Sequence, residues 1–174
     1  MTGKRPRPPL DSDSLRELAL RYVGRFATSR AKLLAYLNRK LQERGWGGDN
    51  PPQPEQLVDR LAELRYVDDR SFAVMKSASL ARRGYGARRV AETLRADGIA
   101  QADREEADAH TRSEAWTAAE RFARRKRLGP YAQDRPDPKQ REKWVAAFLR
   151  AGHSYEIARR WTDAAPGEPP EAPE

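Results

Sequence analysis

The residues whose types could carry catalytic or metal chemistry are two histidines and one adjacent pair of aspartates. His110 and His153 are the only histidines among 174 residues, and their separation gives neither an HxxxH nor an HExxH motif. Asp68 and Asp69 could contact a divalent cation, but one turn lacks the further oxygen ligands that magnesium or calcium requires. Carboxylates at a helix N-terminus accept hydrogen bonds from free amides and face the positive end of the helix dipole. We therefore expect Asp68 or Asp69 to cap a helix, and His153, which follows a glycine at a predicted helix end, to have a capping or surface role.

Gly84-Tyr85-Gly86 is a predicted turn that is superficially similar to a phosphate-binding loop. No strand precedes it and no P-loop lysine accompanies it, so we do not expect it to bind a nucleotide. The chain contains no cysteine, which excludes disulfides, thiolate catalysis and cysteine-ligated zinc. No local nucleophile motif is present either. The sequence therefore predicts a protein that is not an enzyme and that uses no metal and no cofactor.

Basic residues gather in two segments of a chain whose formal net charge is +8. Six cations oppose one acid, Glu92, between Lys76 and Arg95, and five cations stand without an acid between Arg121 and Arg127. Such clusters repel themselves unless a partner neutralises them, and either DNA phosphates or an acidic protein groove could do so. The candidate partner- or DNA-binding residues are Lys76, Arg82, Arg83, Tyr85, Arg88, Arg89, Arg95, Arg121, Arg124, Arg125, Lys126 and Arg127.

A second interpretation of these segments stays open, namely a solvated face in a chain that is rich in arginine. Arg88 and Arg89 argue against it for the first segment, because they begin a predicted helix, where the dipole disfavours cations. Their placement therefore needs another reason.

Apolar residues recur at helical spacing through most of the chain. Ser14 with Glu17 matches a capping box for the first helix, and Ser29 is a good N-cap for a second helix that ends at Gly45. The stripes of the first three helices are Leu15, Leu18, Ala19, Tyr22 and Val23; Leu33, Leu34, Leu37 and Leu41; and Leu57, Val58, Leu61 and Leu64. Glycines and prolines predict a loop over 47–54. Comparable stripes continue to Trp161, and strand patterns are nearly absent.

Three glycines divide this helical pattern into similar parts. Gly45, Gly98 and Gly152 each follow a large apolar residue by four positions and recur at intervals of 53 and 54 residues, as in repeat proteins. We predict an all-α fold of three tandem three-helix repeats in an elongated and curved row. The predicted parts are a disordered basic, Pro-rich tail (1–12), repeats over 13–66, 67–112 and 113–164, and a disordered Pro/Glu tail (165–174).

The composition fits several small helical units better than one large core. Hydrophobic residues make up 38% of the chain and charged residues 34%. We expect Trp116, Trp144 and Trp161 to lie in cores and Trp46 to fill a gap between helices. No apolar run approaches the roughly 20 residues needed to span a bilayer, and the N-terminus does not resemble a signal peptide. We therefore expect a soluble, cytoplasmic protein that does not bind membranes.

Motifs in the middle and last parts of the chain resemble those of a known family. The segments are Tyr66-Val67-Asp68-Asp69, Phe72-Ala73, Arg83-Gly84-Tyr85-Gly86, Arg89-Val90, Leu94, Gly98-Ile99, Leu128-Gly129-Pro130 and Phe148-Leu149-Arg150-Ala151-Gly152-His153-Ser154. Together they closely resemble the central and C-terminal repeats of the RecX regulatory proteins, over roughly Leu15 to Trp161. Two features depart from the family pattern: Lys32 stands where an acidic residue is frequent, and the connection over 47–54 is long and Pro-rich.

The resemblance implies tandem three-helix repeats that are distantly similar to helix-turn-helix units. It also implies a regulator of the recombinase RecA in homologous recombination, DNA repair and the SOS response. Proteins of this family bind the RecA–DNA filament in its groove and modulate, usually inhibit, strand exchange and ATP hydrolysis. The expected partners are therefore RecA and single- or double-stranded DNA, with the chain acting as a monomer. Two alternatives remain: a helix-turn-helix DNA-binding protein that reads duplex DNA with the Arg88–Arg95 helix, and an adaptor for an unrelated acidic protein.

Overall fold

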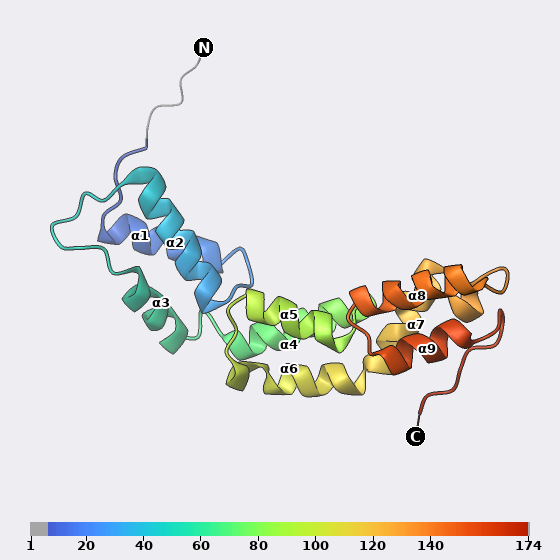
Figure 1. Ribbon diagram of the computed structural model, residues 1–174. Coiled ribbons are helices and arrows are strands. Elements are labelled where there is room, and N and C mark those ends of the chain that lie inside the picture. Colours follow the sequence, from blue (N-terminus) through green and yellow to red (C-terminus); the bar gives the residue numbers. More distant parts are fainter. Residues whose placement is uncertain (1–6, 174) are drawn as a thin grey trace, which may run out of the picture. The chain divides into compact units, whose positions relative to one another are not determined.

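The computed structural model describes residues 7–173, and over this range it contains nine α-helices, one 3-10 helix and no strand (Figure 1). The helices are α1 (Ser12–Val23), α2 (Arg30–Arg44), α3 (Pro54–Glu63), α4 (Asp69–Arg82), α5 (Ala87–Ala96), α6 (Gln101–Ser113), α7 (Ala115–Lys126), η1 (Gly129–Tyr131), α8 (Pro138–Arg150) and α9 (Tyr155–Asp163). The all-α prediction is confirmed. Residues 1–6 of the predicted N-terminal tail, and Glu174, lie outside the described residues.

The chain forms two compact units. The first comprises the described residues up to Phe72 together with Asp97–Ile99, and the second comprises Ala73–Ala96 together with residues 100–173. The short return of the chain to the first unit at Asp97–Ile99 is a long-range contact that no local pattern indicates. The division into three repeats stays a prediction.

The core of the first unit is built by α1, α2 and α3 and also by a residue that precedes them. Its buried members are Leu10, Leu15, Ala19, Leu33, Leu37, Val58, Leu61 and Val67. Leu10 is completely buried, its N–H donates to the Gly45 carbonyl (2.9 Å), and its own carbonyl accepts from the Gly47 N–H (2.8 Å). The prediction of a disordered tail over 1–12 is therefore wrong at Leu10, because an isolated apolar residue among prolines gives no periodic signal.

Side-chain caps fix where the helices of the first unit begin. Asp11, and not Ser14, is the N-cap of α1: its carboxylate accepts from the Ser14 N–H (2.9 Å), while the Ser14 hydroxyl accepts from the Asp11 N–H (2.9 Å). The predicted Ser14–Glu17 box is thus displaced by one turn, and Glu17 instead pairs with Arg21. Asp68 caps α4 as predicted, by accepting from the Ser71 N–H (2.9 Å).

The start of α2 is held by residues that are distant in the sequence. The Ser29 hydroxyl accepts from the Lys32 N–H (3.2 Å) and donates to the Asp97 carbonyl (2.6 Å). Asp69 accepts from the Arg30 N–H (2.8 Å), so its carboxylate caps α2. Lys32 pairs with the Asp97 carboxylate (2.7 Å), which gives the family departure at this position a structural role.

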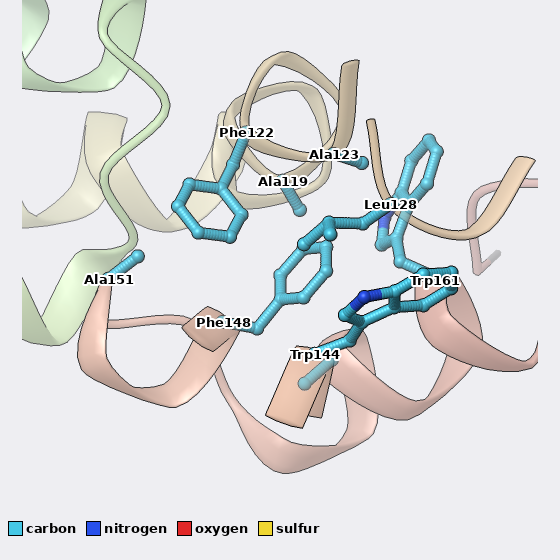
Figure 2. Close-up of a cluster of buried hydrophobic side chains, with 9 residues drawn as sticks. Ala119, Phe122, Ala123, Leu128, Trp144, Phe148, Ala151 and Trp161 are labelled. Atoms are coloured by element: carbon cyan, nitrogen blue, oxygen red, sulfur yellow. The ribbon is translucent and has the colours of Figure 1, made fainter. Parts of the chain in front are cut away.

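The core of the last part of the chain gathers aromatic side chains from α7, α8 and α9. Figure 2 shows the Phe148 side chain between Phe122 on one side and Trp144 and Trp161 on the other, with Leu128 close to it. The Phe122 and Phe148 ring centroids are 4.9 Å apart in an edge-on arrangement. Trp144 and Trp161 are buried, and Trp116 packs against Trp161 (5.1 Å between centroids), so the prediction for these tryptophans is confirmed. Trp46 packs at the edge of the first core, as predicted.

Candidate partner-binding surface

The 84–86 turn between α4 and α5 packs directly against the turn between α8 and α9. The Gly86 N–H donates to the Ala151 carbonyl (2.8 Å) and the Arg88 N–H donates to the Gly152 carbonyl (3.1 Å). A Cβ on Gly86 would lie 2.4 Å from backbone atoms of Gly152, and a Cβ on Gly84 would lie 2.8 Å from the Phe122 nitrogen. The two glycines therefore permit close backbone approach, and the turn is a packing element that fixes the basic residues on either side of it.

His153 lies beneath this turn. Its side chain is buried, and its Nε2 lies 3.0 Å from the Gly84 carbonyl oxygen, so Nε2 carries the proton that is donated. The rings of Phe122 and Phe148 lie 5.6 and 5.5 Å from the imidazole. Burial lowers the pKa of His153 to about 4, against a smaller opposing effect of the Gly84 carbonyl. The prediction of a capping or surface role for His153 is wrong. The 84–86 turn, which is distant in the sequence, covers its side chain.

Arg88 has a partner that explains its unfavourable position at the start of α5. Its guanidinium donates to the Leu149 carbonyl (2.5 Å), in the last turn of α8. A cation is favoured at the negative end of a helix dipole, and Arg88 adds a second hydrogen bond to a carbonyl that already accepts from the Gly152 N–H (3.0 Å). Glu92, one turn further along α5, lies 3.8 Å from Arg88 and 4.0 Å from Arg89. Arg88 therefore has a structural role, whereas Arg89 has an exposed side chain with one distant counter-charge.

Tyr85 brings the two predicted basic segments together. The guanidinium of Arg83 lies 5.3 Å from the centre of the Tyr85 ring, and that of Arg125, on α7, lies 5.9 Å from it. Arg125 also donates to the Arg83 carbonyl and lies 5.7 Å from the Phe122 ring. Arg83 and Arg125 are exposed, while Tyr85 is half-buried against the aromatic core. We call these three residues the Arg83–Tyr85–Arg125 group.

Arg124, next to Arg125, is engaged in a local network. It donates to Glu120 (3.0 Å) and to the Tyr131 hydroxyl (3.2 Å), and the same hydroxyl donates to Glu120 (2.8 Å). The hydrogen bond from Tyr131, followed by that from Arg124, lowers the pKa of Glu120, while burial, followed by the Glu120 hydrogen bond, raises the pKa of Tyr131. This network holds η1 against α7 and leaves Arg124 less available to a partner than its neighbours.

The remaining candidates have looser surroundings. Within residues 7–173, no ion pair involves Arg121, Lys126 or Arg127, and all three side chains are exposed. Over the same range, no ion pair, side-chain hydrogen bond or cation–π contact joins Lys76, Arg82 or Arg95 to the Arg83–Tyr85–Arg125 group. The structure thus brings Arg83, Tyr85 and Arg125 together out of the twelve predicted residues, and leaves the others around them or apart.

The chemistry available to this surface is recognition of anions. A guanidinium offers planar, paired donors that match carboxylate and phosphate oxygens, and it stacks on aromatic rings. Among the described residues, no group of three or more histidine, cysteine, aspartate or glutamate side chains could hold a metal ion. Over residues 7–173, the protein has no helix that is long and apolar enough to cross a membrane.

Sequence comparison identifies similar proteins over almost the whole chain. The chain is 32% identical over 171 residues to regulatory protein RecX of Myxococcus xanthus strain DK1622. The aligned region covers 94% of this chain and 91% of the relative. The chain is also 33% identical over 97 residues to regulatory protein RecX of Agrobacterium fabrum strain C58. That aligned region covers 56% of this chain and 52% of the relative. No family model matches the sequence.

The fold is also that of solved structures. A crystal structure of RecX from Lactobacillus salivarius superposes with a TM-score of 0.59 at 20% identity, over 84% of this chain and 91% of that one. A crystal structure of another regulatory protein RecX superposes with a TM-score of 0.64 at 19% identity, over 94% and 81% of the two chains. Both are likenesses of fold.

Proposed function

The chain belongs to the RecX family of regulatory proteins, and on that premise we propose that it is a cytoplasmic, non-catalytic modulator of the recombinase RecA. It binds the RecA–DNA filament as a monomer and lowers the recombinase and ATPase activities. Its partners are the acidic surface of the filament and the DNA within it, which it contacts through basic residues of the second unit.

The Arg83–Tyr85–Arg125 group is the observation that carries the proposal. Two exposed arginines, 42 residues apart in the chain, are held at one aromatic ring by a turn that is itself locked against α8 and α9. Two neighbouring guanidinium groups repel each other, so an anionic partner that binds both gains more than one that meets a single arginine. A prepositioned pair also costs less ordering entropy on binding than two mobile side chains do.

Recognition of duplex DNA by α5 as a helix-turn-helix is less consistent with the geometry. Recognition helices present their N-terminal residues to base edges in the major groove. In this structure the first turn of α5 is packed on Gly152, and the Arg88 guanidinium is directed to the Leu149 carbonyl. Reading DNA with that end of α5 would require these contacts to break.

The test is the single-stranded-DNA-dependent ATPase rate of the cognate recombinase, titrated with this protein at constant salt. We expect the rate to fall at substoichiometric ratios. Arg83→Glu should raise the concentration needed for half-inhibition by at least about tenfold, since the reversal replaces attraction by repulsion. Arg112→Glu, an exposed reversal on α6 outside the candidate residues, is the matched control and should inhibit like the unmodified protein. An unchanged rate at saturating protein would contradict the proposal.

A further inference from the structure

A second aromatic and basic surface lies in the first unit, on α1, α2 and the segment between them. The rings of Tyr22 and Tyr36 are stacked, with centroids 4.2 Å apart and planes inclined by 21°. Phe26 follows Tyr22 by one turn, with its ring centroid 5.3 Å away. Tyr22 and Tyr36 pack on the core of the unit, but Phe26 is 55% exposed. The three rings therefore form a short row whose outer member faces solvent.

Cations surround this row. The guanidinium of Arg39 and the ammonium of Lys40 lie 5.7 and 5.8 Å from the centre of the Tyr36 ring. Both share one carboxylate, Glu43, at 3.6 and 2.5 Å. Arg25, next to Phe26, is exposed and forms no ion pair with any described residue. From residue 21 to residue 44 the chain carries seven lysines and arginines and a single acid.

The structural roles of these residues do not explain the whole set. Packing accounts for Tyr22 and Tyr36, and exposed phenylalanines occur singly on many proteins. However, an exposed ring that continues a stacked pair and stands among cations with few counter-charges is the arrangement that single-stranded nucleic acid binds. There, unpaired bases stack on aromatic faces while the backbone follows the positive charge. The bases of a duplex are already stacked on one another and do not offer their faces in this way.

We propose that this surface, formed by Tyr22, Arg25, Phe26, Tyr36, Arg39 and Lys40, binds single-stranded nucleic acid. One base stacks on the exposed Phe26 ring, and the phosphates on either side of it contact the cations. Phosphates displace Glu43 readily from Arg39, where the ion pair is exposed and worth little in water, and less readily from Lys40, whose side chain is mostly covered. The proposal does not rest on the modulation of RecA, since it concerns other residues and needs no recombinase.

The experiment measures binding of the full chain alone to a fluorescently labelled oligothymidylate, and to an abasic strand of the same length, by anisotropy. We expect Phe26→Ala to weaken binding to oligothymidylate by about tenfold, within the range seen for loss of one stacked base. Its affinity for the abasic strand should stay that of the unmodified protein. Phe26→Leu keeps apolar contact with Tyr22 but removes the aromatic face, so it should behave like Phe26→Ala and guards against a folding effect.

Tyr66 provides the matched control, because it is 57% exposed in the same unit and no cation lies over its ring among the described residues. Tyr66→Ala should leave both affinities unchanged. Arg25→Gln should reduce the slope of log affinity against log salt by about 0.7, the value for one phosphate contact to a single strand. Equal loss of affinity for both strands, or equal effects of Phe26→Ala and Tyr66→Ala, would overturn the proposal. So would unchanged binding of oligothymidylate by Phe26→Leu, because the aromatic face of Phe26 would then contribute nothing to binding.

Discussion

The buried His153 makes the stability of the protein depend on pH in a defined interval. Its side chain is 3% exposed, and burial lowers the pKa from the usual 6.5 to about 4 in the folded protein. Between these two values the unfolded chain binds a proton at this position and the folded chain does not. The free energy of unfolding therefore has its full value above about pH 6.5 and falls as the pH is lowered towards 4. At about 1.4 kcal/mol for each pH unit of that interval, the loss reaches about 3 kcal/mol.

Substitution of His153 by glutamine isolates this effect. The Gln amide nitrogen can donate to the Gly84 carbonyl in place of Nε2, so the variant keeps the hydrogen bond but has no proton to gain. Urea unfolding, followed by tryptophan fluorescence between pH 7.5 and 4.5, should show a steep decline for the unmodified protein and a shallower one for His153→Gln. Three of the four tryptophans, at 116, 144 and 161, lie in the same unit as His153 and report on it.

His110→Gln is the control, because it removes the other histidine, which is exposed on α6. Its stability should follow the unmodified protein at every pH. The carboxyl groups whose pKa is lowered, including Asp68 and Glu120, also lose stabilisation as the pH falls, but equally in all three proteins, so the difference between curves belongs to the histidine. Parallel curves for His153→Gln and the unmodified protein would refute the reasoning, as would an imidazole NMR titration of His153 with a midpoint near 6.5.

Three further substitutions, two of them paired with a control substitution, test the packing by urea or thermal unfolding. Leu10→Ala should cost about 2–5 kcal/mol despite its place in a Pro-rich segment, whereas Leu20→Ala, at a partly exposed site, should cost less than about 1 kcal/mol. Gly86→Ala should cost about 1–3 kcal/mol, because its Cβ meets the Gly152 backbone. Arg88→Gln should cost about 0.5–1 kcal/mol through α8, and Arg89→Gln less; equal costs would contradict the assigned role of Arg88.

Features that depend on local spacing could be predicted from the sequence. Apolar periodicity places the helices, and the cap at Asp68 follows from the polar residue that precedes an apolar stripe. Gly45, Gly98 and Gly152 all have positive φ just beyond helix ends, where glycine alone has no steric penalty. The shift from Ser14 to Asp11 at the start of α1 shows the limit of such inference, because Ser14 can serve as the cap or as its reciprocal partner.

Features that depend on long-range contacts could not be predicted. The spacing of Asp69 does not reveal that it caps α2, since its partner amide lies 39 residues away. Leu10 lies outside every periodic stripe, and its burial depends on backbone hydrogen bonds to the segment that follows α2. His153 follows a helix-ending glycine, so local reasoning places it at the surface, but the Gly84 carbonyl arrives from 69 residues earlier. In each case the deciding partner is set by tertiary structure.

The basic residues show why charge clusters need geometry before they are given a function. Three arginines of the second unit carry the same formal charge but have different surroundings. Arg88 donates to a carbonyl at the end of α8, and Arg124 belongs to a hydrogen-bond network with Glu120 and Tyr131. Arg83 is exposed beside Tyr85. A substitution that lowers binding therefore has a different meaning at each position. Loss of binding at Arg88 includes a cost to the fold, because its guanidinium adds a charged hydrogen bond at the C-terminal end of α8. At Arg83 that cost is small, since within residues 7–173 its side chain forms no hydrogen bond or ion pair and lies over the Tyr85 ring, and so Arg83 reports most directly on the partner.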